Sequence, residues 1–490
     1  MKILILSIIT LSCACADQRR FPREFEFGAA TSAYQIEGAW NVSGRGESVW
    51  DHLTHSYSFL VADQKTGDIT TDSYHNYKRD VEMMRELGLD SYRFSISWPR
   101  ILPDGLTTVN EDGIAFYNNY IDEMLKYGIK PMVTLYHWDL PLKLRWLGGF
   151  ANPNFPEWFE SYARIAFENF GDRVKFWTTF NEPSQICIPA LSFPEINVAG
   201  VYQCAKNIVL ANAKAYRLYH DEFRSQGGQC GITIDVQWYE PLQDTEENRQ
   251  ATELVRQYQW GLYAKPIFSQ EGGFPKELSE VIATQSAQLG LPSLLLEFTD
   301  EEREFVRGTA DFFGVNHYTG KVVNITKYEH PSGGIETHID YSYMPPDWPQ
   351  SATSWLRQAP HSLFKVLIDL HNKYNGTVFY ITENGWSTLP GVMDDDDRIA
   401  YHRTALEDVL DCLDAGVNIR GYMVWSLMDS FEWDNGYTTC FGLYAVDFED
   451  PERSRTPKKS AFVYKEVVRS RVVDHNYEPA NRTMSIDKGH

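Results

Sequence analysis

Two glutamates, each at the end of a strand-like run, have the residue type and setting for acid–base chemistry. Glu182 stands in Thr-Phe-Asn-Glu-Pro (179–183), and Glu383 stands in Ile-Thr-Glu-Asn-Gly (381–385). In both, a β-branched and aromatic run ends in the carboxylate, and Pro or Gly follows closely to break the strand. We therefore expect both carboxylates at the C-terminal tips of strands. Such a pair can hydrolyse a glycosidic bond, which needs one protonated and one ionised carboxyl group.

The required difference in protonation follows from proximity. In retaining hydrolysis the two carboxyl groups lie about 5 Å apart. At an effective dielectric constant near 20, two negative charges at that distance repel by roughly 3 kcal/mol, which is about two pKa units. One group therefore keeps its proton near neutral pH and can act as the acid. A lone glutamate at a strand end is often only a salt-bridge partner, but two in these contexts favour a catalytic pair.

The elements that position these residues form an alternating pattern. Eight strand-like runs occur at Phe25–Tyr34, Ser91–Ser97, Lys130–His137, Lys175–Glu182, Gly231–Tyr239, Asp311–Tyr318, Val378–Glu383 and Ile419–Leu427. Amphipathic helical patterns lie between them, for example Ser73–Leu87, Ile114–Tyr127, Glu157–Phe170 and Arg398–Asp414. The pattern predicts an α/β fold with one domain over residues 17–490, a single (β/α)8 TIM barrel. An open doubly wound sheet is the alternative, but no Gly-rich phosphate turn supports it.

Barrel enzymes carry their chemistry at the C-terminal ends of the strands, here strands 4 and 7 for the two glutamates. Read in order, the eight tips offer Gln35, Arg93, His137, Asn181 with Glu182, Trp238 or Tyr239, Asn316 with Tyr318, Glu383, and Trp425. Phe431-Glu432-Trp433 follows the last strand. Polar groups and aromatic rings thus converge on one face, which predicts a binding pocket for a hydroxylated ligand.

The amino-acid composition limits the classes of molecule that the protein can bind. The formal net charge of −22 argues against nucleic acid or an anionic membrane surface as a partner. Aromatic residues make up 14% of the chain, which fits both a large core and a carbohydrate site.

Residues 1–16 have the pattern of a signal peptide. Lys2 supplies the positive start, Ile3–Leu11 the apolar stretch, and Ala14–Ala16 a small-residue cleavage site. The apolar run is too short to span a bilayer. No KDEL-type signal ends the sequence, so we expect secretion to the extracellular space after cleavage near Ala16. Four glycosylation sequons agree with that route, at Asn41, Asn324, Asn375 and Asn481.

The sequence does not determine which cysteines form disulfides. Once the signal peptide is removed, five remain: Cys187, Cys204, Cys230, Cys412 and Cys440. An odd number means that at least one stays free or pairs between chains. No CxxC or His/Cys spacing of a zinc site occurs, so no metal is predicted. The acidic run Asp394–Asp397 precedes a helix, which is more typical of a solvated helix N-terminus than of a calcium site.

Several longer motifs resemble those of a known family. They are Phe25–Gly38 (FEFGAATSAYQIEG), Tyr92–Trp98 (YRFSISW), Tyr136–Pro141 (YHWDLP) and Phe431–Trp433 (FEW). With the two glutamate motifs, they resemble glycoside hydrolase family 1, the retaining β-glucosidase family, and particularly its secreted insect members. The resemblance extends over nearly the whole mature length.

The resemblance implies a role for each matching position. Glu182 would be the acid/base and Glu383 the nucleophile, with Arg93 and Tyr318 orienting Glu383 and Tyr318 also contacting substrate. The remaining substrate contacts would come from Gln35, His137, Asn181 and Glu432 at the sugar hydroxyls, Trp433 beside them, Trp425 as the floor, and Trp355 as a wall of the leaving-group site. No cofactor is implied.

Departures from the family pattern gather on the leaving-group side. Ser184 follows Asn-Glu-Pro where Trp is common, and Gln185–Gly200 lacks the usual Gly- and Tyr-rich loop. Asn212 stands where His is usual, and Ala359–Ser362 replaces a Pro-x-Gly pattern. The sugar subsite is therefore expected to be intact, whereas the other half of the substrate stays undetermined.

Three functions remain to be distinguished. The leading hypothesis is a secreted retaining β-glucosidase acting on a small-molecule glycoside, as a monomer or homodimer. The alternative is a thioglucosidase (myrosinase) that hydrolyses glucosinolates, which carry a sulfate and need a basic group. Lys321 is placed for this, with Lys143 and Arg357 more distant, although Lys321 could equally be a surface lysine. A non-catalytic glycoside-binding protein is the third, but such proteins typically lose a catalytic glutamate.

Overall fold

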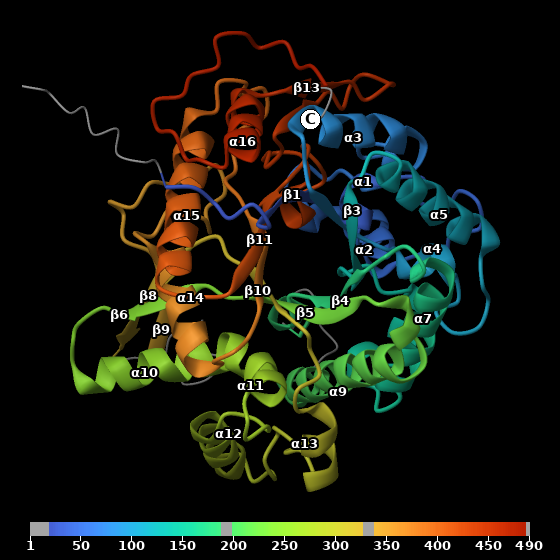
Figure 1. Ribbon diagram of the computed structural model, residues 1–490. Helices are drawn as coiled ribbons and strands as arrows, with labels where there is room; N and C mark the ends of the chain where they lie inside the picture. Colours follow the sequence, from blue (N-terminus) through green and yellow to red (C-terminus); the bar gives the residue numbers. More distant parts are fainter. Residues whose placement is uncertain (1–18, 188–197, 327–337, 487–490) are drawn as a thin grey trace, which may run out of the picture.

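The eight predicted barrel strands form one closed parallel barrel (Figure 1). The computed structural model describes residues 19–187, 198–326 and 338–486, so the predicted signal peptide lies outside the described residues. The strands are β1 (Glu26–Ala30), β2 (Ser91–Ser95), β3 (Lys130–Tyr136), β4 (Phe176–Asn181), β5 (Gln229–Asp235), β7 (Phe313–Asn316), β10 (Phe379–Asn384) and β11 (Ile419–Trp425). Each pairs in parallel with its neighbours, and β1 closes on β11. The TIM-barrel prediction is confirmed.

Helices form an outer layer around the strands (Figure 1). The longer ones are α2 (Val49–Ser56), α3 (Ser73–Leu87), α5 (Glu111–Leu125), α7 (Phe155–Phe170), α9 (Val198–Glu222), α10 (Glu246–Arg256), α11 (Leu262–Phe268), α12 (Lys276–Gln288), α13 (Asp300–Val306), α14 (Ser362–Lys373), α15 (Asp396–Asp414) and α16 (Lys459–Ser470). Gly88 ends α3 with φ 71°, a left-handed conformation that glycine adopts without steric cost. No helix in the described ranges is long and apolar enough to cross a membrane.

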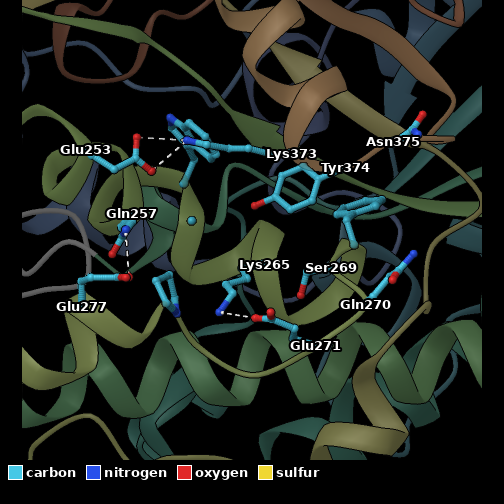
Figure 2. Close-up of a pocket in the computed structure, with 14 residues that line it drawn as sticks. Glu253, Gln257, Lys265, Ser269, Gln270, Glu271, Glu277, Lys373, Tyr374 and Asn375 are labelled. Atoms are coloured by element: carbon cyan, nitrogen blue, oxygen red, sulfur yellow. Dashed lines mark hydrogen bonds and ion pairs between the residues drawn. The ribbon is translucent and has the colours of Figure 1, made fainter. Parts of the chain in front are cut away.

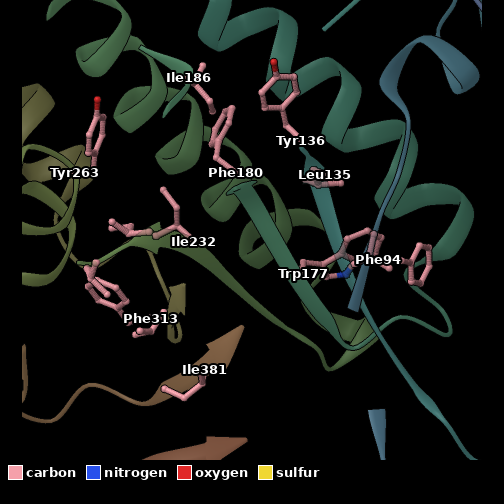
Figure 3. Close-up of a cluster of buried hydrophobic side chains, with 14 of the residues drawn as sticks. Phe94, Leu135, Tyr136, Trp177, Phe180, Ile186, Ile232, Tyr263, Phe313 and Ile381 are labelled. Atoms are coloured by element: carbon pink, nitrogen blue, oxygen red, sulfur yellow. The ribbon is translucent and has the colours of Figure 1, made fainter. Parts of the chain in front are cut away.

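Alternating residues of the strands face two separate cores. On β4, Trp177 and Phe180 are fully buried and pack outward on α7, with Phe180 4.2 Å from Phe159 between ring centroids (Figure 3). Phe176 points the other way and meets Tyr380 of β10 at 5.7 Å. Phe176 and Tyr380 lie near the N-terminal ends of their strands, so they fill the barrel interior and leave its C-terminal ends for polar groups.

Two predicted strands extend furthest beyond the observed C-terminal ends, by four residues each. The first ends at Ala30, and Gln35 lies on the short helix α1 (Ala33–Ile36). The fifth ends at Asp235, which pairs with Asn316, the last residue of β7. Pairing with the barrel strand β7 stops there, and the chain leaves the barrel. It then forms β6 (Trp238–Pro241), which pairs with β8 (Gly320–Ile325) in a small sheet completed by β9 (Ile339–Tyr343).

One disulfide joins Cys187 to Cys204, which lie 17 positions apart in the sequence. Cys187 follows the short helix α8 (Pro183–Ile186), and Cys204 lies in α9. Among the described cysteines, Cys230, Cys412 and Cys440 are free and buried. The disulfide therefore fixes the segment that follows strand β4 to the outer layer.

Candidate active site

Glu383, in β10, is held by two donors from other strands and loops. Arg93 of β2 donates through Nη1 to Oε1 at 2.6 Å, and the Tyr318 hydroxyl donates to Oε2 at 2.8 Å. The Glu383 residue is only 3% exposed. Both carboxylate oxygens are therefore fixed in direction, and a positive charge lies against one of them.

Glu182 follows β4 in a different setting. Its φ of 54° is left-handed, and it precedes Pro183 at the start of α8. Asn316 of β7 donates through Nδ2 to Glu182 Oε1 at 2.7 Å. Burial, reinforced by the negative charges of Glu383 and Asp235, raises the pKa of Glu182 well above its usual range. This carboxyl group therefore keeps its proton while Glu383 lies against a guanidinium.

Asn181 connects the strands that carry these groups. Its Oδ1 accepts from Arg93 Nη2 at 2.6 Å and from Asn316 Nδ2 at 3.0 Å. Its Nδ2 donates to His137 Nε2 at 3.1 Å. Burial, with the charge of Arg93 nearby, lowers the pKa of His137 well below its usual range, so this imidazole is neutral. Strands β2, β3, β4 and β7 are thus cross-linked by buried polar side chains at their tips.

Gln35 and Glu432 add buried polar groups beside this network. Gln35 is fully buried, donates to the Phe431 carbonyl at 2.8 Å, and accepts from Ser32 at 2.7 Å. Ser430 donates to Glu432 Oε1 at 3.0 Å. Burial raises the pKa of Glu432 to about 8. The structure therefore brings these two predicted residues to the strand tips from α1 and from the loop after β11.

Aromatic rings line the same region. The ring of His137 is nearly parallel to those of Trp425 and Trp433, at centroid distances of 5.9 and 6.1 Å. Trp433 also packs on Trp138 at 4.7 Å. Trp355 is 39% exposed and meets Tyr318 edge-on at 5.6 Å. Trp425 and Trp433 thus both pack on His137, whereas Tyr318 packs on the more exposed Trp355.

Lys321 is a half-buried residue on β8, outside the barrel itself. Burial lowers the pKa of its ammonium group, and the charge of Asp235 opposes that effect. Within the described parts of the chain, the Lys321 ammonium group makes no hydrogen bond or ion pair, while its backbone pairs with Tyr239 of β6. Of the two more distant cations, Lys143 is exposed, and Arg357 donates to the carbonyls of Pro346 and Trp348. Lys321 is therefore a less solvated cation than an ordinary surface lysine.

Sequence reasoning missed the contacts at the tip of β5. The Ser184 hydroxyl lies 2.7 and 2.6 Å from the two carboxylate oxygens of Asp235, and Gln185 donates to Oδ2 at 2.9 Å. The predicted strand continued to Tyr239, so Asp235 was placed inside the strand instead of at its tip. A shorter strand would have identified this carboxylate as a rim residue.

The acidic run at the start of α15 is only partly solvated: Asp394, Asp396 and Asp397 are exposed, and Asp396 and Asp397 lie in the first turn of the helix. Asp395 is fully buried, pairs with Arg398 and accepts from Ser460 at 2.6 Å. Asp396 pairs with Lys459 at 2.6 Å. The prediction of a solvated helix N-terminus therefore fails only for Asp395, which is buried because it meets Ser460 of α16, far along the chain. In the described ranges, no group of three or more His, Cys, Asp or Glu residues could hold a metal ion.

A separate pocket of about 460 Å³ lies outside the barrel, between the end of α14 and the turn that joins α10 to α11 (Figure 2). Its two lysines are already paired, Lys373 with Glu253 at 2.8 Å and Lys265 with Glu271 at 3.5 Å. The sequon residue Asn375 lies at its edge. None of the predicted catalytic or substrate-binding residues lines this pocket.

The sequence and fold both match a known family. The model of glycosyl hydrolase family 1 matches residues 17–473. The chain belongs to glycosyl hydrolase family 1. Myrosinase 1 of Brevicoryne brassicae is 39% identical over 464 residues, covering 92% of this chain and 98% of that protein. The cytosolic beta-glucosidase of Homo sapiens is 38% identical with the same coverage. The recognition from sequence motifs is therefore confirmed, and this family 1 chain is a glycoside hydrolase.

Solved structures of the family agree with the barrel. The aphid myrosinase is 38% identical, covers 92% of this chain and 99% of its own, and superposes with a TM-score of 0.86. The beta-glucosidase from Trichoderma harzianum is 35% identical, with 92% and 98% coverage and a TM-score of 0.85. A rice beta-glucosidase variant in a covalent complex with Glc is 34% identical, with 91% and 98% coverage and a TM-score of 0.83.

Proposed function

We propose that this family 1 hydrolase is a secreted retaining β-glucosidase, with Glu383 as the nucleophile and Glu182 as the acid/base. The observation that carries the proposal is the contrast between the two carboxyl groups. Glu383 is fixed by Arg93 and Tyr318, whereas Glu182 is buried with a raised pKa. One is suited to attack and the other to donate a proton.

The first step forms a covalent intermediate. Glu383 attacks the anomeric carbon as Glu182 donates its proton to the leaving oxygen, and the glycosidic bond breaks. Arg93 and Tyr318 direct the attacking carboxylate. The covalent Glc complex of the related rice enzyme supports an intermediate of this kind.

The second step restores the enzyme. Glu182, now ionised, accepts a proton from water as the water oxygen attacks the anomeric carbon. The ester bond to Glu383 breaks, and the sugar leaves with its original anomeric configuration. Two displacements at one carbon give net retention.

We call the group formed by Gln35, His137, Asn181, Glu383 and Glu432 the sugar side. Hydroxyl groups of a pyranose need both donors and acceptors, and these side chains supply amide, imidazole and carboxyl groups at the strand tips. Trp425 and Trp433 add apolar ring faces against which the C–H groups of a sugar can pack. We call the group formed by Ser184, Lys321 and Trp355 the leaving-group side.

Substitution of each glutamate tests the assignment. Glu383→Ala should abolish glucose release from every β-glucoside. Glu182→Ala should lose activity on poor leaving groups while retaining more on activated aryl glucosides, because these leave without a proton. Adding azide to Glu182→Ala should give β-glucosyl azide, since azide needs no base. Glu301→Ala, an exposed carboxyl on α13, is the control. Unchanged glucose release by Glu383→Ala would contradict the proposal.

A thioglucosidase is the second candidate, favoured by the half-buried Lys321 and by the similarity to aphid myrosinase. Glucose release from an aryl O-β-glucoside and from a glucosinolate, measured side by side, separates the two. Preference for the glucosinolate, lost in Lys321→Ala, would make the enzyme a thioglucosidase. Preference for the O-glucoside, unaffected by that substitution, would leave β-glucosidase as the function.

Secretion and glycosylation belong to the same proposal. Asn41, Asn375 and Asn481 are exposed, and Asn324 is half-buried. We expect the secreted chain to begin near Asp17 and to carry glycans chiefly at the three exposed positions. N-terminal sequencing and glycopeptide mass spectrometry of protein from a secreting host test this. A chain retained in the cells with residues 1–16 still attached would contradict it.

A further inference from the structure

The turn that carries Glu182 is tied to the neighbouring strand by one carboxylate. Ser184 and Gln185 lie in α8, directly after Glu182, and both donate to Asp235 at the end of β5. The Glu182 amide also donates to the Thr233 carbonyl of β5 at 3.0 Å. The left-handed backbone of Glu182 is thus held from both sides by β5, although such a conformation is unfavourable for a residue with a side chain.

The same carboxylate contributes charge. Asp235 is only 9% exposed, so its interactions with nearby groups are weakly screened. Its charge acts on Glu182 on one side and on Lys321 of β8 on the other. In the described parts of the chain Lys321 forms no ion pair with Asp235, so it does not neutralise that carboxylate by direct contact.

We propose that Asp235 is a positioning residue for the acid/base. It holds the turn that bears Glu182 and places a negative charge beside it, so that Glu182 remains protonated to higher pH. This inference rests on the proposed role of Glu182. It assigns a function to the position that follows Asn-Glu-Pro, because Ser184 is one of the two side chains that connect that turn to Asp235.

The groups around Glu182 support this assignment. Glu383 from β10 and Asp235 from β5 favour its protonated form, whereas Arg93 from β2 and the Asn316 amide from β7 favour the ionised form. Asp235 itself has a pKa raised by burial to about 6, with the Ser184 and Gln185 donors opposing the rise. Asp235 is therefore mainly ionised above pH 6. Its negative charge is thus present in the pH range where Glu182 must stay protonated.

The consequence is specific to the alkaline side of the pH profile. Glycosidic bond cleavage requires protonated Glu182, so kcat/KM falls as pH rises through the pKa of Glu182. Removing the Asp235 charge lowers that pKa and brings the fall to lower pH.

The test compares Asp235→Asn and Asp235→Glu in the full chain. The pH dependence of kcat/KM is measured on an aryl β-glucoside with a poor leaving group. Asp235→Asn keeps an acceptor for Ser184 but lacks the charge, so the alkaline limb should move down by about one pH unit, the size of effect that a nearby charge has. Asp235→Glu restores the charge and should keep the limb near its wild-type position.

Two controls separate charge from structure. Ser184→Ala leaves the charge in place, so its alkaline limb should stay near the wild-type pH even where kcat falls. An activated dinitrophenyl glucoside needs no proton, so Asp235→Asn should change its profile little. An unmoved alkaline limb in Asp235→Asn, with wild-type activity and an inactive Glu383→Ala, would overturn this inference alone. Failure of the wild-type enzyme to release glucose would overturn the proposed function instead.

Discussion

The sugar side is held by buried hydrogen bonds between barrel strands, whereas the leaving-group side depends on short elements outside the barrel. Asn181 and Arg93 connect residues from five strands through bonds of 2.6 to 3.1 Å. In contrast, Lys321 lies on a side sheet, Trp355 is 39% exposed, and Ser184 lies in a helix of one turn. The difference indicates that the chemistry is fixed by the barrel and the choice of leaving group by its additions.

This contrast has an energetic basis. A buried polar network must be fully paired, because each unsatisfied group costs about 1–3 kcal/mol, so few substitutions are tolerated. Substituting a partly exposed side chain lowers the free energy of unfolding much less. We therefore expect substitutions on the sugar side to reduce both catalysis and stability, and substitutions on the leaving-group side to alter substrate preference.

The largest effect is expected at Arg93. Arg93→Met leaves Glu383 and Asn181 without their shared donor in a buried site. We expect kcat/KM to fall roughly a hundred- to a thousandfold and the free energy of unfolding to fall by about 3–5 kcal/mol. Steady-state kinetics and urea unfolding measure the two.

A matched control is Arg164→Met, which breaks a partly exposed ion pair with Glu222. Exposed pairs contribute about 1 kcal/mol or less, so this variant should behave like the wild type. Equal losses in the two variants would show that the strand-tip network is no more important than a surface pair.

A smaller effect is expected at the disulfide. Cys187→Ser with Cys204→Ser removes a cross-link between positions 17 apart in the sequence, next to α8. Loop closure of this size stabilises a fold by roughly 3 kcal/mol, so the melting temperature should fall. Because the disulfide anchors the leaving-group side, KM for bulky aglycones should change more than the rate of glycosyl-enzyme hydrolysis. A fall in rate confined to hydrolysis of the glycosyl-enzyme would contradict the assignment of the disulfide to the leaving-group side.

The smallest effect is expected at Trp355. Trp355→Ala removes a half-exposed ring that packs on Tyr318. An aromatic contact contributes about 1 kcal/mol, so KM for an aryl glucoside should rise about fivefold with kcat nearly unchanged. Leu289→Ala, an exposed apolar residue after α12, serves as the control. A large fall in kcat would place Trp355 on the sugar side instead.

The sugar side could be predicted from sequence because its residues sit in long local motifs at strand tips. Asn181 ends β4, Glu383 lies near the end of β10 and Arg93 lies within β2, so the barrel topology brings the three side chains together. Gln35 was read as the tip of a predicted strand that ended at Tyr34, but it lies on α1, and the resemblance assigned its role.

The other features of the site and fold depend on tertiary contacts, which a local sequence pattern does not reveal. The sequence did not identify Asp235 as a strand-end residue, because the strand-like alternation of side chains continues past it into β6. That strand pairs with β8 rather than with the barrel. The pairing of Cys187 with Cys204 and the burial of Asp395 against α16 also depend on tertiary structure. Periodicity identifies elements, but it does not say which partner a strand end or a carboxylate will meet.

The most direct test of the account is to trap the glycosyl-enzyme. A 2-deoxy-2-fluoro-β-glucoside with a good leaving group forms the intermediate faster than water removes it. We predict a covalent label on the peptide that contains Glu383, found by mass spectrometry after digestion, and no label in Glu383→Ala. A label on another carboxylate, or inactivation without any label, would contradict the assignment of Glu383 as the nucleophile.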